Sequence, residues 1–166
     1  MRKLRKPASV GLVGIALFLL SACGWASTSS QPAAVGTPTC VNASAPHKAH
    51  VVVDHLSGTV IDKCVGFSTE KAGGADLMTA SGIDFKTQHF SFGDAACAID
   101  NEPASFNTCL PQDAPYWALW TSTAGGPWVM AQTGFAAVLL GNGDALGWRY
   151  TPSTETNPAP PPPAKK

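Results

Sequence analysis

Short β-branched and aromatic stretches separated by turn residues set the pattern of the chain from about residue 40 onward. Residues 50–56 and 59–68 are two such stretches, divided by Ser57 and Gly58, and this arrangement predicts two strands joined by a turn. Residues 75–80 follow as an apolar segment that precedes Gly82. Because glycine suits the left-handed conformation that often ends a helix, we expect one short helix here.

The pattern after this helix predicts a run of further strands. Aromatic and β-branched residues alternate with turn signals such as the segment from Asp100 to Pro103. We expect the strands at residues 85–92, 96–99, 116–122, 128–132 and 145–150. The order of two strands, one helix and several strands predicts a small α+β domain with a mostly antiparallel sheet.

Large aromatic side chains gather in the last third of the chain. Four of the five tryptophans and both tyrosines fall between residues 116 and 150. Side chains alternate across a strand, so Tyr116 and Trp120 share one face while Trp117 and Leu119 share the other. One face should be core, and the other is either an exposed binding surface or a second buried face. The candidate ligand-binding residues are therefore Tyr116, Trp117, Trp120, Trp128, Trp148 and Arg149.

The first 22 residues have the pattern of a secretory signal. A basic start is followed by an apolar run at residues 10–20, which is too short to span a bilayer as a mature helix. The segment from Leu20 to Cys23 resembles the bacterial lipobox, in which cleavage precedes a cysteine that carries diacylglycerol. This predicts a protein lipid-anchored through Cys23 to the outer face of the bacterial cell membrane. The alternative is cleavage after Ala26 and release as a secreted protein.

Two segments flank the predicted domain. Residues 23–39 are rich in Ser, Thr, Ala and Pro without apolar periodicity, which is typical of a flexible tether. Residues 152–166 include four consecutive prolines, and we expect a disordered, Pro-rich tail. The folded domain is thus predicted at residues 40–151.

The cysteine count supports lipidation. Five cysteines are an odd number for an exported protein, and setting Cys23 aside leaves Cys40, Cys64, Cys97 and Cys109. Four cysteines allow three disulfide connectivities. Pairing in sequence order closes two short loops and is preferred, whereas a thiolate metal site lacks the usual Cys-x-x-Cys spacing.

Charge argues against a nucleic-acid partner. The 11 basic and 11 acidic residues balance, but Arg2, Lys3, Arg5 and Lys6 leave with the signal, so 7 basic residues remain and the net formal charge becomes −4. The remaining Lys and Arg residues are scattered, and phosphate binding requires clustered positive charge.

Candidate metal and catalytic residues are few. His47, His50 and His55 lie near Asp54 in a pattern that can bind Zn or Cu, but His50 and His55 point to opposite faces of a strand, so we expect solvated histidines and no metal.

The carboxylates of Asp100 and Glu102 could do acid and base work, although a turn at this position favours solvent. No nucleophile elbow, zinc-protease motif or phosphate-binding loop is present, and we expect no catalytic residues.

Four segments together resemble a known family: residues 75–82 (ADLMTASG), 97–103 (CAIDNEP), 116–120 (YWALW) and 143–150 (GDALGWRY). They resemble the transcobalamin C-terminal-like domain of unknown function in exported bacterial proteins, over roughly residues 49–150. The resemblance implies a β-grasp-like fold. In distant vitamin carriers such a domain caps bound cobalamin, so the resemblance implies a binding module more than an enzyme.

We therefore expect a membrane-anchored, extracytoplasmic and non-catalytic binding module for a small ligand, with a corrinoid-like molecule as the ligand that the resemblance implies. No cofactor is assigned beyond that. The alternative is a cell-envelope protein-interaction module that uses an aromatic patch or its Pro-rich tail.

Overall fold

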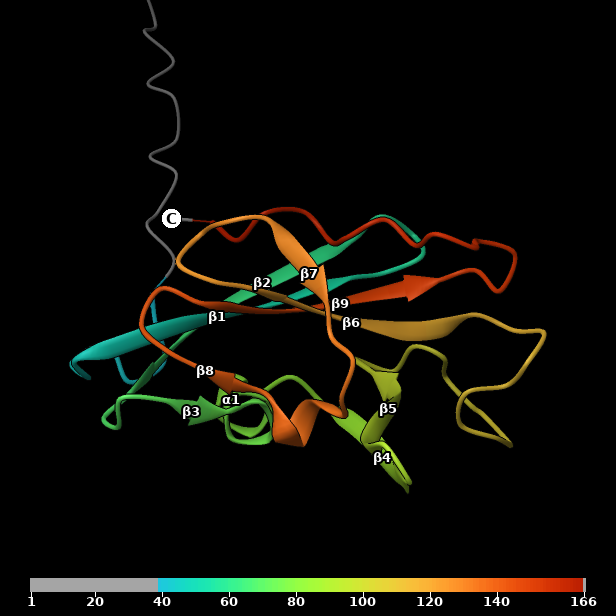
Figure 1. Cartoon of the computed structure of the whole chain (residues 1–166), viewed down its shortest axis with the longest axis horizontal. Coiled ribbons are helices and arrows are strands. Elements are labelled where there is room, and N and C mark those ends of the chain that lie inside the picture. Colours follow the sequence, from blue (N-terminus) through green and yellow to red (C-terminus); the bar gives the residue numbers. More distant parts are fainter. Residues whose placement is uncertain (1–38, 166) are drawn as a thin grey trace, which may run out of the picture. The chain divides into compact units, whose positions relative to one another are not determined.

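The computed structural model describes residues 39–165, which are organised around a five-stranded sheet (Figure 1). In chain order its strands are β1 (His47–Asp54), β2 (Val60–Phe67), β6 (Tyr116–Ser122), β7 (Trp128–Met130) and β9 (Ala145–Thr151). Their order across the sheet is β2-β1-β9-β6-β7, and neighbours are antiparallel except β1 and β9, which are parallel. The strands β1 and β9 thus lie side by side within the sheet, which agrees with the small α+β domain that the residue pattern predicts and with the β-grasp-like fold that the resemblance implies.

The N-terminal predictions fall outside this region. The signal peptide (residues 1–22), lipidation at Cys23 and all but the last residue of the tether at 23–39 are not among the described residues. Within residues 39–165, the structure contains no helix that is long and apolar enough to cross a membrane.

The remaining elements lie on one side of the large sheet (Figure 1). They are β3 (Ala72–Gly73), α1 (Gly74–Ser81), β4 (Phe85–Phe90), β5 (Gly93–Ile99), the 3-10 helix η1 (Phe135–Ala137) and β8 (Leu139–Leu140). β4 pairs with β5 and β3 with β8, both antiparallel. α1 ends at Gly82 in the left-handed conformation, φ 71°, as the sequence predicts. The β3–β8 pair was not predicted, since two-residue strands show no periodicity.

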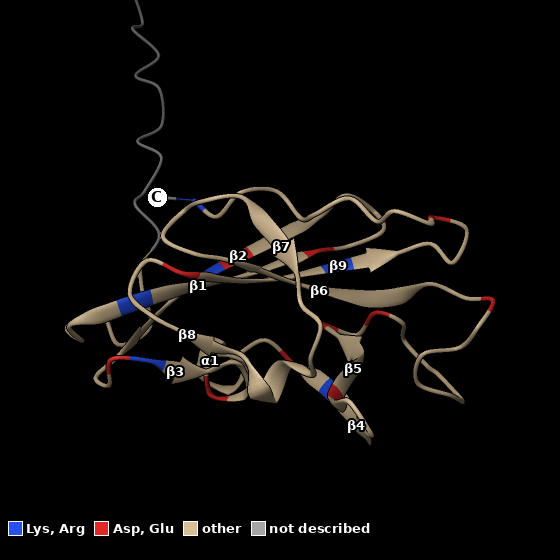
Figure 2. Cartoon of the chain, in the orientation of Figure 1, with Lys and Arg blue, Asp and Glu red and all other residues tan. Residues whose placement is uncertain are grey.

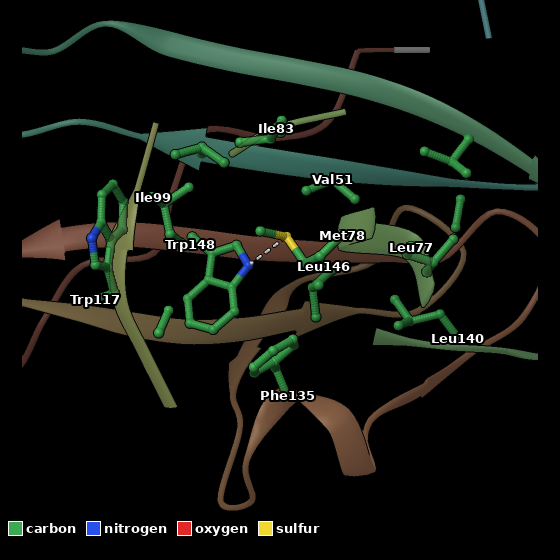
Figure 3. Packing of buried hydrophobic residues seen from close by; sticks show 14 of the residues in the cluster. Val51, Leu77, Met78, Ile83, Ile99, Trp117, Phe135, Leu140, Leu146 and Trp148 are labelled. Atoms are coloured by element: carbon green, nitrogen blue, oxygen red, sulfur yellow. Dashed lines mark hydrogen bonds between the residues drawn. The ribbon is translucent and has the colours of Figure 1, made fainter. Parts of the chain in front are cut away.

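Apolar side chains between this layer and the sheet form the core (Figure 3). Trp148 on β9 is its largest fully buried side chain, and the indole Nε1 lies 3.2 Å from the sulfur of Met78 on α1. Phe135 of η1 packs against the Trp148 ring with centroids 5.5 Å apart. Burying each such side chain contributes about 1.5 to 3 kcal/mol, so this face of the sheet is the main source of stability.

The opposite face of the sheet is also covered. Val52 and Trp120 point to this face and are 0% and 7% exposed. The C-terminal tail crosses it (Figure 1), with Pro161 buried and the backbone N–H of Lys165 bonded to the Asp62 carboxylate. The sequence leaves open whether the second aromatic face is exposed; the structure buries it. The sequence also predicts a disordered tail, whereas residues 152–165 follow a defined path over the sheet.

Two disulfides join the four cysteines in sequence order. Cys40 pairs with Cys64 of β2, and Cys97 of β5 pairs with Cys109, which confirms the preferred connectivity. By the loop-entropy argument, each stabilises the fold by about 3 kcal/mol. Disulfides persist in oxidising compartments, so the chain belongs outside the cytoplasm.

Charged residues are distributed thinly over the fold. Figure 2 shows Lys and Arg on separate elements, each with acidic residues on neighbouring segments. The charges therefore do not build one basic or acidic field, and among the described Lys and Arg residues Arg149 forms the ion pairs, with Asp54 and Glu155.

Candidate functional site

A histidine and a carboxylate meet at one end of the sheet. His55 directly follows β1, and its Nδ1 lies 2.6 Å from Oε2 of Glu102. The His55 side chain is 8% exposed. Its Nε2 is buried without a hydrogen-bond partner among residues 39–165, and Oδ2 of Asp100 is 3.6 Å away. The expectation of a solvated histidine is therefore wrong for His55.

A tight turn after β5 brings Glu102 to His55. Asp100 and Asn101 have φ of 47° and 62°, the left-handed values of a two-residue hairpin turn that Asp and Asn tolerate. Ile99 and Glu102 exchange backbone hydrogen bonds of 3.0 and 2.9 Å across this turn. Glu102 thus folds back and is 25% exposed, while Asp100 points outward and is 53% exposed. The prediction of two solvent-facing carboxylates agrees with the structure for Asp100 alone.

Trp117 on β6 is held by this arrangement. Its Nε1 donates a hydrogen bond of 2.8 Å to the backbone carbonyl of Glu102. Its ring meets the edge of His55 at a centroid distance of 5.6 Å and tilts against Tyr150 at 4.9 Å. Three neighbours therefore fix the orientation of the Trp117 ring.

A cleft of about 320 Å³ opens beside the fixed ring. Its walls come from the segment 103–115, from Ala96 and Cys97 of β5 and from aromatic rings of β6 and β9. The large side chains in this lining are those of Phe106, Leu110, Tyr116, Trp117 and Tyr150. No Asp, Glu, Lys, Arg or His lines this cleft, so it is uncharged: aromatic and apolar side chains form most of its lining, and Ser105, Asn107 and Thr108 add neutral polar groups.

A second cleft of about 340 Å³ adjoins the first. Both are bounded by Leu110, Tyr116 and Trp117, and the second extends to Phe92 and to residues 130–134. Both clefts therefore meet at the ring pair that begins β6.

The six predicted ligand-binding residues lie in two places, three at the clefts and three on the opposite face of the sheet. Tyr116 and Trp117 line both clefts, and Trp148 reaches the second one from the core. Trp120 and Trp128 lie on the opposite face of the sheet, near the tail. Sequence reasoning missed Tyr150 and Phe106, although the aromatic count around β9 was a signal for Tyr150.

Arg149, the sixth residue, is occupied by carboxylates. It also lies on the opposite face, with Nε 3.8 Å from Asp54 and Nη2 3.9 Å from Glu155. Burial raises the pKa of Asp54, and although the Arg149 and His55 charges oppose this, the net pKa stays above its ordinary value. Arg149 thus stabilises a partly buried carboxylate instead of facing the clefts.

Tyr150 meets the cleft as a neutral phenol. Burial, together with the negative charge of Glu102, raises its pKa above the ordinary value of 10.0. The ring therefore offers an uncharged surface and a hydroxyl donor over the whole physiological pH range.

Histidine and carboxylate pairs occur elsewhere but do not build a metal centre. His50 pairs with Asp62 at 2.8 Å and His89 with Asp94 at 2.7 Å. Within residues 39–165, the structure gathers no group of three or more His, Cys, Asp and Glu side chains that could hold a metal ion. The Asp100 and Glu102 carboxylates face different ring nitrogens of His55, so a single ion could not take all three.

Comparison with known proteins gives little beyond this geometry. No protein-family model and no curated protein matches the sequence. A crystal structure of a "putative metal binding protein" from Ruminococcus gnavus matches with a TM-score of 0.47 and 14% identity, over 64% of this chain and 97% of that chain. A likeness at this level carries no argument about the ligand or the activity of the present chain.

Proposed function

We propose that this protein is an extracytoplasmic, non-catalytic binding module for a small, uncharged ligand that bears a ring. The observation that carries the proposal is the cleft of about 320 Å³ walled by Trp117, Tyr150 and Tyr116 without any charged lining residue. Apolar pockets with a few polar atoms, at or above about 300 Å³, are the usual sites of small ligands.

The fixed orientation of Trp117 supports binding. Its hydrogen bond to Glu102 and its contacts with His55 and Tyr150 order the ring before a ligand arrives. A preordered wall avoids part of the entropy cost of association, and stacking on an aromatic ring contributes about 0.5 to 1.5 kcal/mol beyond area burial. A planar, uncharged ring system gains most from such a wall.

Shielding of His55 supports a non-catalytic role. Its Nε2 is buried and its Nδ1 is engaged by Glu102, so neither nitrogen is placed to move a proton on a bound molecule. In this proposal the His55 and Glu102 pair positions Trp117 and does not react.

The resemblance to the transcobalamin C-terminal-like domain makes a corrinoid the first candidate ligand. The cleft has room for an edge or side group of so large a molecule and not for the whole. A domain with this cleft would therefore cover one side of a corrinoid, as a cap does, while its anchor at Cys23 would hold the complex at the membrane. Envelope proteins that share such a ligand would be its partners.

Tryptophan fluorescence of the chain tests the proposal. Residues 24–166 are titrated with cobalamin, haem and uncharged aromatic metabolites, and saturable quenching by one of them is expected. Phe106→Ala removes a half-exposed ring from the cleft and should weaken this binding at least tenfold. Leu139→Ala, an exposed apolar residue on β8 outside both clefts, is the matched control. A flat response across the panel, or equal loss in both variants, would refute the proposal.

A further inference from the structure

The sheet face opposite α1 carries a groove that the chain fills with its own tail. Gly147 of β9 forms its floor: a Cβ there would lie 2.7 Å from Cγ of Pro161 and 2.7 Å from Cζ3 of Trp128. Both rings therefore rest against the backbone at a position that only glycine leaves open. Of the prolines in residues 152–165, Pro161 alone is buried.

A buried carboxylate holds the end of the tail. The side chain of Asp62 is 3% exposed; its Oδ2 accepts the backbone N–H of Lys165, and its Oδ1 lies 2.8 Å from Nδ1 of His50. A carboxylate with so little access to water needs such partners, and the tail supplies one of them. The groove therefore recognises the tail at two points, an apolar one at Gly147 and a polar one at Asp62.

Between and around these points the tail is loosely held. Ser153, Thr154, Thr156, Asn157 and the prolines at 160, 162 and 163 are exposed. The ion pair of Glu155 with Arg149 is long, at 3.9 Å, and bridges partly exposed groups. A cavity of about 470 Å³ remains between Trp128 and residues 163–165, so the tail does not fill the groove at its end. Segments with few buried contacts detach at low free-energy cost.

We propose that this groove exchanges its own tail for the proline-rich tail of a second copy of the chain. A stiff, extended proline-rich segment that packs against tryptophan is a recurring mode of peptide recognition. The occupant needs no further specification, since a second copy carries the same Pro161 and Lys165. Reciprocal exchange of an identical segment gives a symmetric dimer without a new interface.

The protein concentration determines whether the tail occupies its own groove or the groove of a second copy. A tail linked to its own groove competes at an effective concentration in the millimolar range. The chain is therefore monomeric when dilute, and exchange sets in where copies are crowded or where the internal contact is weakened.

Two complementary variants of residues 24–166 test the exchange. Pro161→Asp leaves the groove intact and disables the tail. Gly147→Ala fills the place of Pro161 and frees an intact tail. Each variant alone should stay monomeric, and their equimolar mixture should form a heterodimer at micromolar concentration, measured by sedimentation velocity. Pro160→Asp, which changes the exposed neighbouring proline, replaces Pro161→Asp in the control mixture and should give no dimer.

A second measurement tests the proposal without Gly147→Ala, in case that variant does not fold. A labelled peptide of residues 157–165 should bind Pro161→Asp at least tenfold more tightly than it binds wild type, by fluorescence anisotropy. The same peptide with aspartate in place of its Pro161 should not bind. Binding of unrelated proline-rich peptides with equal affinity would overturn the second copy as the occupant. If the mixture of folded variants stays monomeric, or if the peptide does not bind Pro161→Asp, the groove does not bind the tail of a second copy.

Discussion

Trp117 donates its indole N–H to the backbone carbonyl of Glu102 at 2.8 Å. This hydrogen bond ties the five-stranded sheet to the turn after β5. Trp120, on the same strand, also has a buried indole N–H but finds no hydrogen-bond partner within residues 39–165. The two tryptophans lie on opposite faces of the strand, and of the two indole N–H groups only that of Trp117 is hydrogen-bonded.

This difference predicts unequal costs for the same substitution. Trp117→Phe removes the hydrogen bond and leaves the Glu102 carbonyl without it, whereas Trp120→Phe loses only ring volume. We expect Trp117→Phe to lower the free energy of unfolding by about 1 kcal/mol more than Trp120→Phe. Urea unfolding followed by circular dichroism measures both. Equal losses would show that the Trp117 hydrogen bond contributes nothing net.

Glu102→Ala should destabilise the fold through His55. The substitution leaves a buried imidazole Nδ1 without its partner, and we expect a loss of about 1 to 3 kcal/mol. Asp100→Asn is the control, because Asp100 is 53% exposed and its carboxylate lies 3.6 Å from Nε2 of His55. Asparagine also tolerates the positive φ of this position. A change below about 0.5 kcal/mol is expected there. Similar losses in the two variants would argue against the Glu102 contact as the dominant one.

Asp62 predicts an acid dependence of stability. Burial alone would raise its pKa, but the His50 hydrogen bond and the Lys165 N–H outweigh this and hold the pKa below the ordinary value of 3.8. A carboxyl with a lowered pKa stabilises the fold above its unfolded pKa, and that contribution disappears as the pH falls through the folded pKa. The stability advantage of wild type over Asp62→Asn should thus be full above pH 5 and shrink below pH 3.8. Urea midpoints measured from pH 7 to pH 2.5 test this, and a constant difference would contradict it.

The two disulfides should have similar effects on stability, slightly larger for the longer loop closed by Cys40 and Cys64, and different effects on the clefts. Replacing either pair by alanine should cost about 3 kcal/mol. Only the Cys97 and Cys109 pair ties residues 103–115 to β5, so its loss alone should speed amide exchange in that segment. The Cys40 and Cys64 double variant is the matched control. Slow exchange of residues 103–115 in both variants would show that the segment is held by other contacts.

Local patterns predicted most of the fold, because the longer strands and the helix carry their own signals, whereas the two-residue strands β3 and β8 do not. The alternation of Tyr116 and Trp117 matches β6, and Gly82 ends α1 as expected. The candidate site was harder to predict, since its contacts join residues far apart in the chain. His55 and Glu102 are 47 positions apart, so the local sequence pattern around His55 does not predict that its side chain is buried.

The tail shows the same limit of sequence reasoning. Its proline content is typical of disorder when read alone. The docking of Pro161 depends on Gly147 and Trp128, whose roles emerge only once β7 and β9 are placed. A glycine within an otherwise apolar strand was the available signal, since such a residue often marks the close approach of another chain segment.

The parallel pairing of β1 with β9 also governs when the domain can fold. His47–Asp54 precedes Ala145–Thr151 by most of the domain, yet the two strands are neighbours at the centre of the sheet. A chain that emerges with its N-terminus first, from a ribosome or across a membrane, cannot close this pair until Ala145–Thr151 has emerged. The five-stranded sheet is therefore completed late, through slow, non-local contacts.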